Sequence, residues 1–228
     1  MINFVAMQDI AVIFDMDGVI AHTNPYHAKA FEVFFDRHQI AYSDADYIQH
    51  INGKHNSHIF SHFFKRKIHG DELLVLEDEK EGLFREIYQS EVKPLPYFPE
   101  FLTDLYENGL QLGVATSAPL ANMDLILDTL AIRKYFKSTL GSENVSLHKP
   151  HPEVYLKSAD NLAVDPTRCF VFEDSFSGVT AGLNAQMHVV GVLSTNTKDE
   201  LPPCIRYVED YKNIKAQDLL DFMAQHVV

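Results

Sequence analysis

Two carboxylates stand one residue apart directly after an apolar run. Residues 10–14, Ile-Ala-Val-Ile-Phe, predict a buried strand, and Asp15 and Asp17 follow it, with Gly18 next in the chain. A pair of acids at the tip of a buried strand is unfavourable unless a cation or a reaction uses it. Taken alone, the pair could also be an acidic exit from a strand into a loop, so the groups further along the chain decide between the two interpretations.

Other expected strand ends also carry polar side chains. One apolar run ends at the hydroxyls of Thr116 and Ser117, and another ends at Glu173 and Asp174, while Lys149 precedes a proline that opens a predicted helix. Each group alone has a structural explanation as a helix cap, a loop acid or a surface charge. Because the carboxyl ends of parallel strands meet at one edge of a sheet, together they predict at least three carboxylates, a hydroxyl and an ammonium at one site.

This set of groups suits phosphoryl transfer through an aspartyl-phosphate. One carboxylate attacks phosphorus, a second protonates the leaving oxygen, and a hard divalent cation neutralises the charge that gathers. Ligands that are all oxygen atoms indicate Mg²⁺. The hydroxyl and ammonium donors would hold the phosphoryl oxygens.

The elements that must position these groups differ between two parts of the chain. Residues 24–92 show helical patterns only, beginning with Asn24 as the expected N-cap and Pro25 at the first helical position, and a proline-rich segment follows at residues 93–99. After it, strand and helix alternate, which is typical of a parallel, doubly wound sheet. The expected later strands are residues 110–116, 138–141, 168–173, 188–193 and 205–208.

The predicted fold class is therefore α/β, with a doubly wound parallel-sheet Rossmann-like core and an α-helical cap inserted after the first strand. The core is expected to comprise residues 1–23 and 93–228, and the cap residues 24–92. Catalytic groups in such sheets collect at the carboxyl ends of the strands.

The order of these motifs resembles the haloacid dehalogenase superfamily, in the branch with a helical cap after the first strand. The segment Asp15-Met16-Asp17-Gly18-Val19 is similar to the first motif of that family, Thr116 to the second and Lys149 to the third. Glu173-Asp174 is similar to the fourth motif. The four motifs span nearly the whole chain.

The resemblance implies a role for each of these acids. Asp15 would be the nucleophile and Asp17 the general acid and base, and Mg²⁺ would be held by the Asp15 side chain, the Asp17 main-chain carbonyl and Asp174. Glu173 would be a further ligand of the ion, or would contact the ligands without binding the ion itself. Dehalogenases and phosphonatases as groups lack an aspartate at the position of Asp17, so its presence favours a phosphate ester, whose leaving oxygen needs a proton.

Within the family, residues 15–27 are similar to the β-phosphoglucomutase group, including Thr23 and His27. The resemblance implies that the histidine at the position of His27 helps hold the general acid and that cap residues bind the sugar phosphate. Thr23 and His27 are therefore candidate substrate-binding residues, although His27 could equally be an ordinary surface histidine. Asn52 and Asn56 stand where the mutases carry a lysine and an arginine for a second phosphate. An amide replaces a bidentate arginine poorly.

The segment that begins at Ser117 also lacks a lysine that the mutases carry. Ser117 itself is a candidate substrate-binding residue, and Lys54 and His55 could compensate for the missing cap cations. The comparison favours a phosphatase for a small sugar phosphate or a similar metabolite, with a β-phosphoglucomutase-like phosphohexomutase as the alternative. Two alternatives from other classes remain: a phospho-aspartate signalling module, and a binding scaffold with a decayed site. Every catalytic position is filled here, which disfavours the scaffold.

Composition limits the partners. The chain of 228 residues carries 32 Asp and Glu against 19 Lys and Arg, a net charge of −13, so nucleic acid and anionic membranes are not expected partners. We expect a small phosphate ester as substrate, a monomer or weak homodimer, and a cytoplasmic location, because residues 1–7 show no signal-peptide pattern.

Histidines concentrate in the predicted cap. Eight of the twelve lie between His22 and His69, and His58 and His62 are four residues apart on an expected helix. That spacing allows a transition-metal site. No third ligand is evident in register with the pair, so solvated surface histidines are the favoured interpretation.

Overall fold

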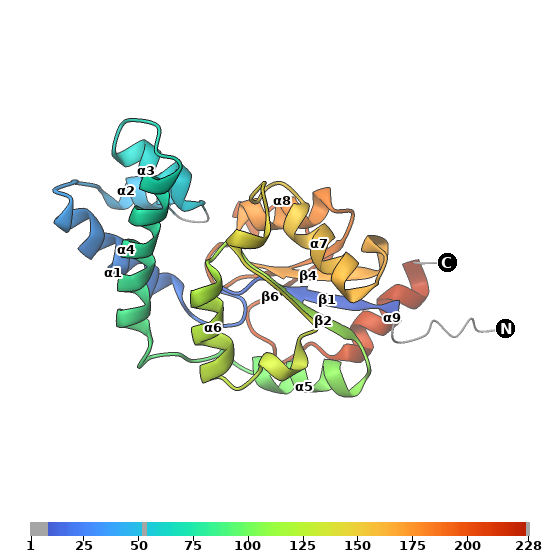
Figure 1. Cartoon of the computed structure of the whole chain (residues 1–228). Coiled ribbons are helices and arrows are strands. Elements are labelled where there is room, and N and C mark those ends of the chain that lie inside the picture. Colours follow the sequence, from blue (N-terminus) through green and yellow to red (C-terminus); the bar gives the residue numbers. More distant parts are fainter. Residues whose placement is uncertain (1–8, 52–53, 227–228) are drawn as a thin grey trace. The chain divides into compact units, whose positions relative to one another are not determined.

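The computed structural model describes residues 9–51 and 54–226 of the chain (Figure 1). The chain divides into two compact units. One, which we call the core unit, comprises residues 1–22 and 93–228; the other, the helical unit, comprises residues 23–92. The division lies one residue before the boundary expected from the sequence.

The core unit is built on a sheet of six parallel strands in the order β3-β2-β1-β4-β5-β6. Their bounds are β1 (Ala11–Phe14), β2 (Gln111–Ala115), β3 (Ser138–Leu140), β4 (Cys169–Glu173), β5 (His188–Val192) and β6 (Arg206–Val208). All the strands expected from the sequence are confirmed, and each end differs from the expected one by at most one residue. β1 lies between β2 and β4, so the strand order reverses beside β1, which is where such sheets place their ligands.

Helices cover both faces of this sheet (Figure 1). α7 (Glu153–Leu162) and α8 (Phe176–Asn184) pack on one face, and α5 (Phe98–Glu107) and α9 (Ala216–His226) lie on the other. Side chains alternate along each strand and so supply both interfaces.

The two faces are packed differently. Ala11 and Ile13 belong to the aliphatic cluster under α7 and α8. The ring of Phe14, on the other face, lies 5.3 Å from that of Phe98 and 5.1 Å from that of Phe172.

The remaining elements of the core unit are one helix and short turns. They are α6 (Leu120–Thr129) and the 3₁₀ turns η3 (Arg133–Tyr135), η4 (Ser142–Asn144), η5 (Pro166–Arg168) and η6 (Lys198–Glu200). The chain leaves and re-enters the core unit through adjacent segments, because the Leu95 N–H donates to the Ile20 carbonyl at 2.9 Å and Ala21 forms a bridge with Pro94. The proline-rich segment thus begins by pairing with the segment that follows β1.

The helical unit contains only helical elements among its described residues. These are α1 (Asn24–Arg37), α2 (Asp44–Asp46), the π-helical turn η2 (Tyr47–Ile51), α3 (Asn56–Phe63) and α4 (Asp71–Tyr88). α1 and α4 pack along each other through aromatic rings, with Tyr26 and Tyr88 at 4.7 Å between ring centroids. Among the described residues, no helix is long and apolar enough to cross a membrane.

Two helix ends in this unit differ from the sequence-based predictions. α1 begins at Asn24 itself, so the N-cap is Thr23; Pro25 still falls in the first turn, where its missing N–H leaves no hydrogen bond unmade. The helical pattern over residues 57–67 predicts a helix of that length, but α3 ends at Phe63. Lys65 adopts a left-handed backbone with φ of 55°, which stops the helix there.

Candidate active site

Strand alternation places the two key carboxylates on the same face of the sheet. Asp15 continues β1, since its N–H donates to the carbonyl of Phe172 in β4 at 3.0 Å. In a strand, residues two apart point to the same face, so Asp15 points the same way as Ile13, and Glu173 the same way as Val171. The side chains of Ile13 and Val171 both face α7 and α8. The carboxylates of Asp15 and Glu173 therefore emerge side by side at the end of the sheet.

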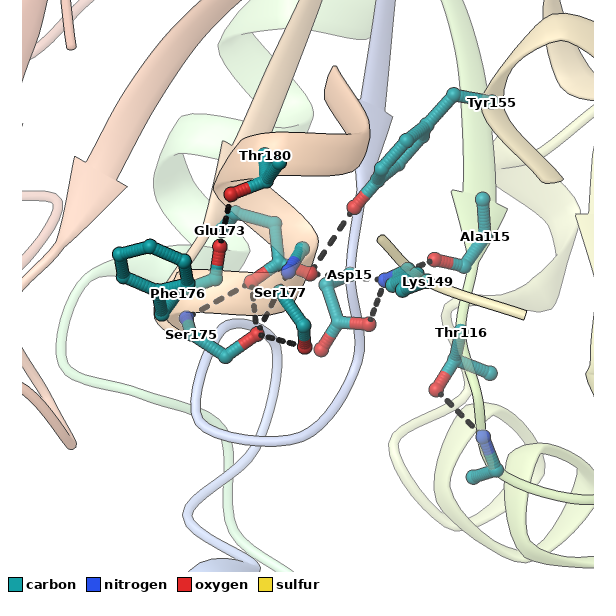
Figure 2. A network of polar contacts seen from close by, with 12 residues as sticks. Asp15, Ala115, Thr116, Lys149, Tyr155, Glu173, Ser175, Phe176, Ser177 and Thr180 are labelled. Carbon is teal, nitrogen blue, oxygen red and sulfur yellow. Dashed lines mark hydrogen bonds and ion pairs between the residues drawn. The ribbon is translucent and has the colours of Figure 1, made fainter. Parts of the chain in front are cut away.

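Lys149 joins these two carboxylates. Its Nζ donates to Oδ1 of Asp15 at 2.6 Å, to Oε1 of Glu173 at 2.8 Å and to the carbonyl of Ala115 at 3.1 Å. The ammonium also lies 4.8 Å from the centre of the Tyr155 ring. Figure 2 shows Lys149 between Asp15 and Ala115, so one buried cation connects the ends of β1, β2 and β4.

Both oxygens of Glu173 receive hydrogen bonds from the protein. Oε1 accepts from Lys149 and, at 3.1 Å, from the hydroxyl of Tyr155 on α7. Oε2 accepts from the N–H of Ser175 at 2.9 Å and from its hydroxyl at 3.0 Å (Figure 2). Glu173 is 1% exposed, so these donors hold its carboxylate in one place.

A glycine makes room for this carboxylate. A Cβ atom placed on Gly178, in the first turn of α8, would lie 1.6 Å from Oε1 of Glu173. No other residue type fits at this position without moving Glu173. The Ser175 hydroxyl caps α8 by accepting from the Gly178 N–H at 3.1 Å, so the helix start and the carboxylate share one set of contacts.

Asp174 is held from the loop that follows β5. Its Oδ2 accepts from the hydroxyl of Thr195, and its main-chain carbonyl accepts from Nδ2 of Asn196 at 2.8 Å. The sequence analysis did not single out Thr195, Asn196 or Tyr155. The polar run after the expected strand at residues 188–193 was the signal for the first two; Tyr155 lies in a helical pattern, where nothing distinguishes it from a core residue.

Three further candidates lie on the loops at the same sheet edge. Thr116 follows β2 and is 1% exposed, and its Oγ1 accepts from the N–H of Ala118 at 3.1 Å (Figure 2). Ser117 beside it is half-buried. Asp17 lies in the turn after β1, where Gly18 takes a left-handed φ of 71° and Asp17 forms a bridge with Ala21.

Negative charge dominates this edge of the sheet. Burial, together with the nearby carboxylates of Glu173 and Asp17, raises the pKa of Asp15 to about 7, although the charge of Lys149 lowers it. Burial and the charges of Glu173 and Asp15 also raise the pKa of Asp174 well above its usual value. Burial alone would lower the pKa of Lys149, but Asp15 and Glu173 raise it well above its usual value, so Lys149 is a cation.

The donor set fits a magnesium ion. Asp15, Asp174 and Glu173 are all buried, and the ion pairs of Lys149 join Asp15 and Glu173, so carboxylates outnumber cations among these residues and favour a bound cation. Carboxylate and carbonyl oxygens are the ligands that Mg²⁺ prefers. After burial, which is the largest cause, neighbouring carboxylates also contribute to the raised pKa values of Asp15 and Asp174.

Two candidate residues of the helical unit, His27 and Asn56, belong to one hydrogen-bond network. Lys80 and Glu81 on α4 are buried, and Nζ of Lys80 donates to Oε1 of Glu81 at 2.9 Å and to Nδ1 of His27 at 2.8 Å. Nδ2 of Asn56 donates to the same Glu81 oxygen at 2.8 Å. His27 and Asn56 are thus brought together through an ion pair that the sequence analysis did not identify.

The other candidates of this unit lie apart from that pair. His55 caps α3 through Nδ1, which accepts from the Ser57 N–H at 3.2 Å, and Lys54 is exposed. Thr23 precedes α1 without a side-chain cap hydrogen bond. The prediction for Asn52 lies outside the described residues.

Comparison with known proteins gives the family. The family described as haloacid dehalogenase-like hydrolase matches residues 12–192. Fructose-1-phosphate phosphatase YqaB of Escherichia coli K12 is 30% identical over 79% of this chain and 95% of its own length. The phosphorylated carbohydrates phosphatase of Thermotoga maritima is 31% identical over 77% of this chain and 81% of its own length.

The fold agrees with this assignment. The crystal structure of β-phosphoglucomutase from Clostridium difficile superposes with a TM-score of 0.81 at 24% identity, covering 95% of this chain and 98% of that one. The chain therefore belongs to the haloacid dehalogenase-like hydrolases, with an α/β Rossmann-like core and the helical cap of that family. The resemblance and fold class predicted from the sequence are confirmed.

Proposed function

We propose that the protein is a Mg²⁺-dependent phosphatase that hydrolyses a small phosphorylated metabolite, a sugar phosphate, through an aspartyl-phosphate on Asp15. The observation that carries the proposal is the buried contact of 2.6 Å between Nζ of Lys149 and Oδ1 of Asp15. It fixes one carboxylate oxygen at the end of β1. Among the described residues, Oδ2 of Asp15 accepts no hydrogen bond, so this oxygen can attack phosphorus.

The reaction then needs two proton transfers at Asp17. As Oδ2 of Asp15 bonds to phosphorus, the bond from phosphorus to the leaving oxygen breaks and protonated Asp17 supplies the proton to that oxygen. In the second step the ionised Asp17 takes a proton from water, the water oxygen bonds to phosphorus, and the Asp15–phosphorus bond breaks. The Lys149 ammonium and the hydroxyl of Thr116 would hold phosphoryl oxygens in both steps.

Mg²⁺ would be held by the Asp15 side chain, the Asp17 carbonyl and Asp174. When bound, the ion neutralises charge that develops on the phosphoryl oxygens. For Glu173 we favour a positioning role over direct ligation, because Lys149, Tyr155 and Ser175 already donate to its two oxygens. The ligand role expected from the sequence stays a prediction.

The substrate class rests on two relatives. Both are named as phosphatases of phosphorylated carbohydrates, and one is named for fructose 1-phosphate. We extend only the class to this chain. The residues that we propose to select the sugar, Thr23, His27, Lys54 and Asn56 with Asn52 and Ser117, remain predictions.

A phosphohexomutase is the second candidate, and the fold shared with a β-phosphoglucomutase keeps it in view. A mutase must hold a second phosphate with cations while its intermediate reorients. Lys80 is a cation that the sequence analysis overlooked, yet Glu81 neutralises it at 2.9 Å and the Phe31 ring lies 4.3 Å from its Nζ. This pairing favours the phosphatase.

One experiment separates these activities. Hexose 1-phosphates and 6-phosphates are incubated with the protein and Mg²⁺, with and without chelator, and free phosphate is measured beside isomerised hexose phosphate. For β-glucose 1-phosphate, a trace of the 1,6-bisphosphate is added. The proposal predicts Mg²⁺-dependent phosphate release in excess over isomerisation. Predominant glucose 6-phosphate would establish the mutase, and no turnover of any ester would favour a signalling or binding module.

A further inference from the structure

A second group of metal-ligating side chains lies within the helical unit, away from the Lys80 and Glu81 network. Asp46 ends α2, His50 lies in η2, and His62 lies on α3. One ligand atom of each residue lies within 4.8 Å of the other two. The rings of His50 and His62 are stacked, with centroids 3.7 Å apart and planes inclined by 17°.

Local structure explains why these three side chains meet. Asp46 and His50 are four residues apart on consecutive helical turns, so they share one face. The carboxylate is oriented by Ser43, whose N–H and hydroxyl donate to Oδ2 at 2.8 and 2.7 Å. Oδ1 of Asp46 has no hydrogen-bond partner among the described residues and is available to a ligand. α3 then brings His62 against His50.

We propose that Asp46, His50 and His62 bind a divalent transition cation such as Zn²⁺. Two imidazoles and one carboxylate are a ligand set that binds Zn²⁺, with bonds of about 2.0–2.2 Å and water in the fourth position. The three ligand atoms must move closer together to bind one ion. The side chains have room to move, because Asp46 and His50 are only half-buried and His62 is exposed. Rotation about the bond to an imidazole ring is also soft.

This set differs from the pair that spacing alone indicated. The ring of His58 lies 6.5 Å from that of His62, against 3.7 Å for His50. Mg²⁺ binds hard oxygen ligands and would not compete for two imidazoles, so this site and the carboxylates of the core unit select different ions.

Occupancy would restrain a segment with candidate specificity residues. The chain between His50 and His62 carries Lys54 and Asn56. A cation that joins the two histidines closes this segment into a loop and reduces its conformational freedom. We therefore expect Zn²⁺ to stabilise the helical unit irrespective of which substrate the enzyme hydrolyses.

The test is calorimetric titration of tag-free, full-length protein with Zn²⁺ in the presence of excess Mg²⁺. One saturable site is expected in the native protein. His50→Ala, His62→Ala and Asp46→Asn should each weaken Zn²⁺ binding by at least about tenfold. His69→Ala, an exposed histidine of the same unit outside the group, and His58→Ala should bind as the native protein does.

A second measurement guards against misfolded variants. Thermal unfolding without Zn²⁺ should be the same for each variant and the native protein, and Zn²⁺ should raise the midpoint only where the three ligands are intact. Absence of a saturable site in the native protein would overturn the proposal. So would unchanged binding in His50→Ala, or loss of binding in His58→Ala equal to that in His62→Ala.

Discussion

Among the residues that the structure describes, charged side chains are buried in two places, and the two places differ in charge balance. At the sheet edge of the core unit, Lys149 pairs with Asp15 and Glu173, and Asp174 follows Glu173; the three carboxylates are at most 6% exposed. In the helical unit, Lys80 faces Glu81, and both are at most 4% exposed. The first group has an excess of carboxylates over cations; the second contains one of each.

The pKa shifts follow this balance. Burial and neighbouring carboxylates raise the pKa of Asp15 to about 7. Burial would also raise the pKa of Glu81, but the charge of Lys80, the nearby ring of His27 and the hydrogen bonds of Asn56 and Lys80 lower it to about 2. In a pair of one cation and one carboxylate, each charge stabilises the other. A group with more carboxylates than cations is stabilised instead when it binds a further cation. In this protein the two pKa shifts therefore run in opposite directions, upward at Asp15 and downward at Glu81.

Replacing the nucleophile should separate activity from stability most strongly. Asp15→Asn should reduce phosphate release by at least about 10⁴-fold, because an amide cannot attack phosphorus. Its stability should not fall, since the fold raises the pKa of Asp15 and the ionised carboxylate therefore opposes folding at neutral pH. Lys149 keeps Glu173 as its partner. Steady-state kinetics and urea unfolding test both parts; near-native phosphate release would exclude the covalent mechanism.

The proton donor should matter only for some substrates. Asp17→Asn should slow sugar phosphates by about 10²–10⁴-fold, because their alkoxide leaving groups need a proton. Aryl phosphates with acidic leaving groups should be affected much less. Rates on matched alkyl and aryl esters measure the difference, and equal losses on both would contradict the role of Asp17.

Glu173 holds Lys149 in place, and a substitution at Gly178 tests whether this positioning matters for catalysis. In Gly178→Ala the new methyl would displace the Glu173 carboxylate and with it Lys149, and we expect kcat to fall by about 10²-fold, as for a displacement of about 1 Å at a reacting group. The control is Gly82→Ala in α4, where the nearest atom to a Cβ is Nη2 of Arg85 at 3.9 Å. This control should keep its activity and gain about 0.5–1 kcal/mol of stability. Equal kcat values for the two variants would show that the position of Glu173 does not matter.

The ion pair of Lys80 and Glu81 should make the free energy of unfolding depend on pH in the acid range. The folded protein lowers the pKa of Glu81 from 4.5 to about 2, so its stabilisation is present above pH 4.5 and is lost as the pH falls from there through about 2. The loss should be on the order of 3 kcal/mol. Unfolding free energies of the native protein and Glu81→Gln across this range measure it. The variant should be less stable at neutral pH and lose less on acidification; parallel curves would refute the assignment.

The sequence predicted the core unit more completely than the helical unit. In the core unit, apolar runs end at the polar residues Asp15, Thr116 and Glu173, and this pattern marks the ends of strands. The structure places these three side chains at one edge of the sheet. α9 was not predicted, although its buried residues Ala216, Leu219 and Met223 recur at helical spacing. Tyr155 was missed because its hydroxyl has a role only once α7 packs on the sheet and brings it to Glu173.

In the helical unit, local spacing revealed only some of the contacts between histidines. His58 and His62 share a helix, but the stacked pair joins His62 to His50 on a different element. Lys80 and Glu81 look like an ordinary charged stretch of a surface helix, and only the packing of α4 against α1 buries them. Long-range packing decides these contacts, and sequence spacing carries little information on it.

The central claim is that Asp15 becomes phosphorylated, and trapping the intermediate tests it most directly. The protein is mixed with Mg²⁺ and a turned-over sugar phosphate, quenched in acid within one turnover, and reduced with borohydride, which converts an aspartyl-phosphate to homoserine. Mass spectrometry of the peptide that contains residue 15 then locates the change. The account predicts homoserine at Asp15 in the native protein and none without substrate. Full turnover with an unmodified Asp15 at every quench time, or modification at another carboxylate, would contradict it.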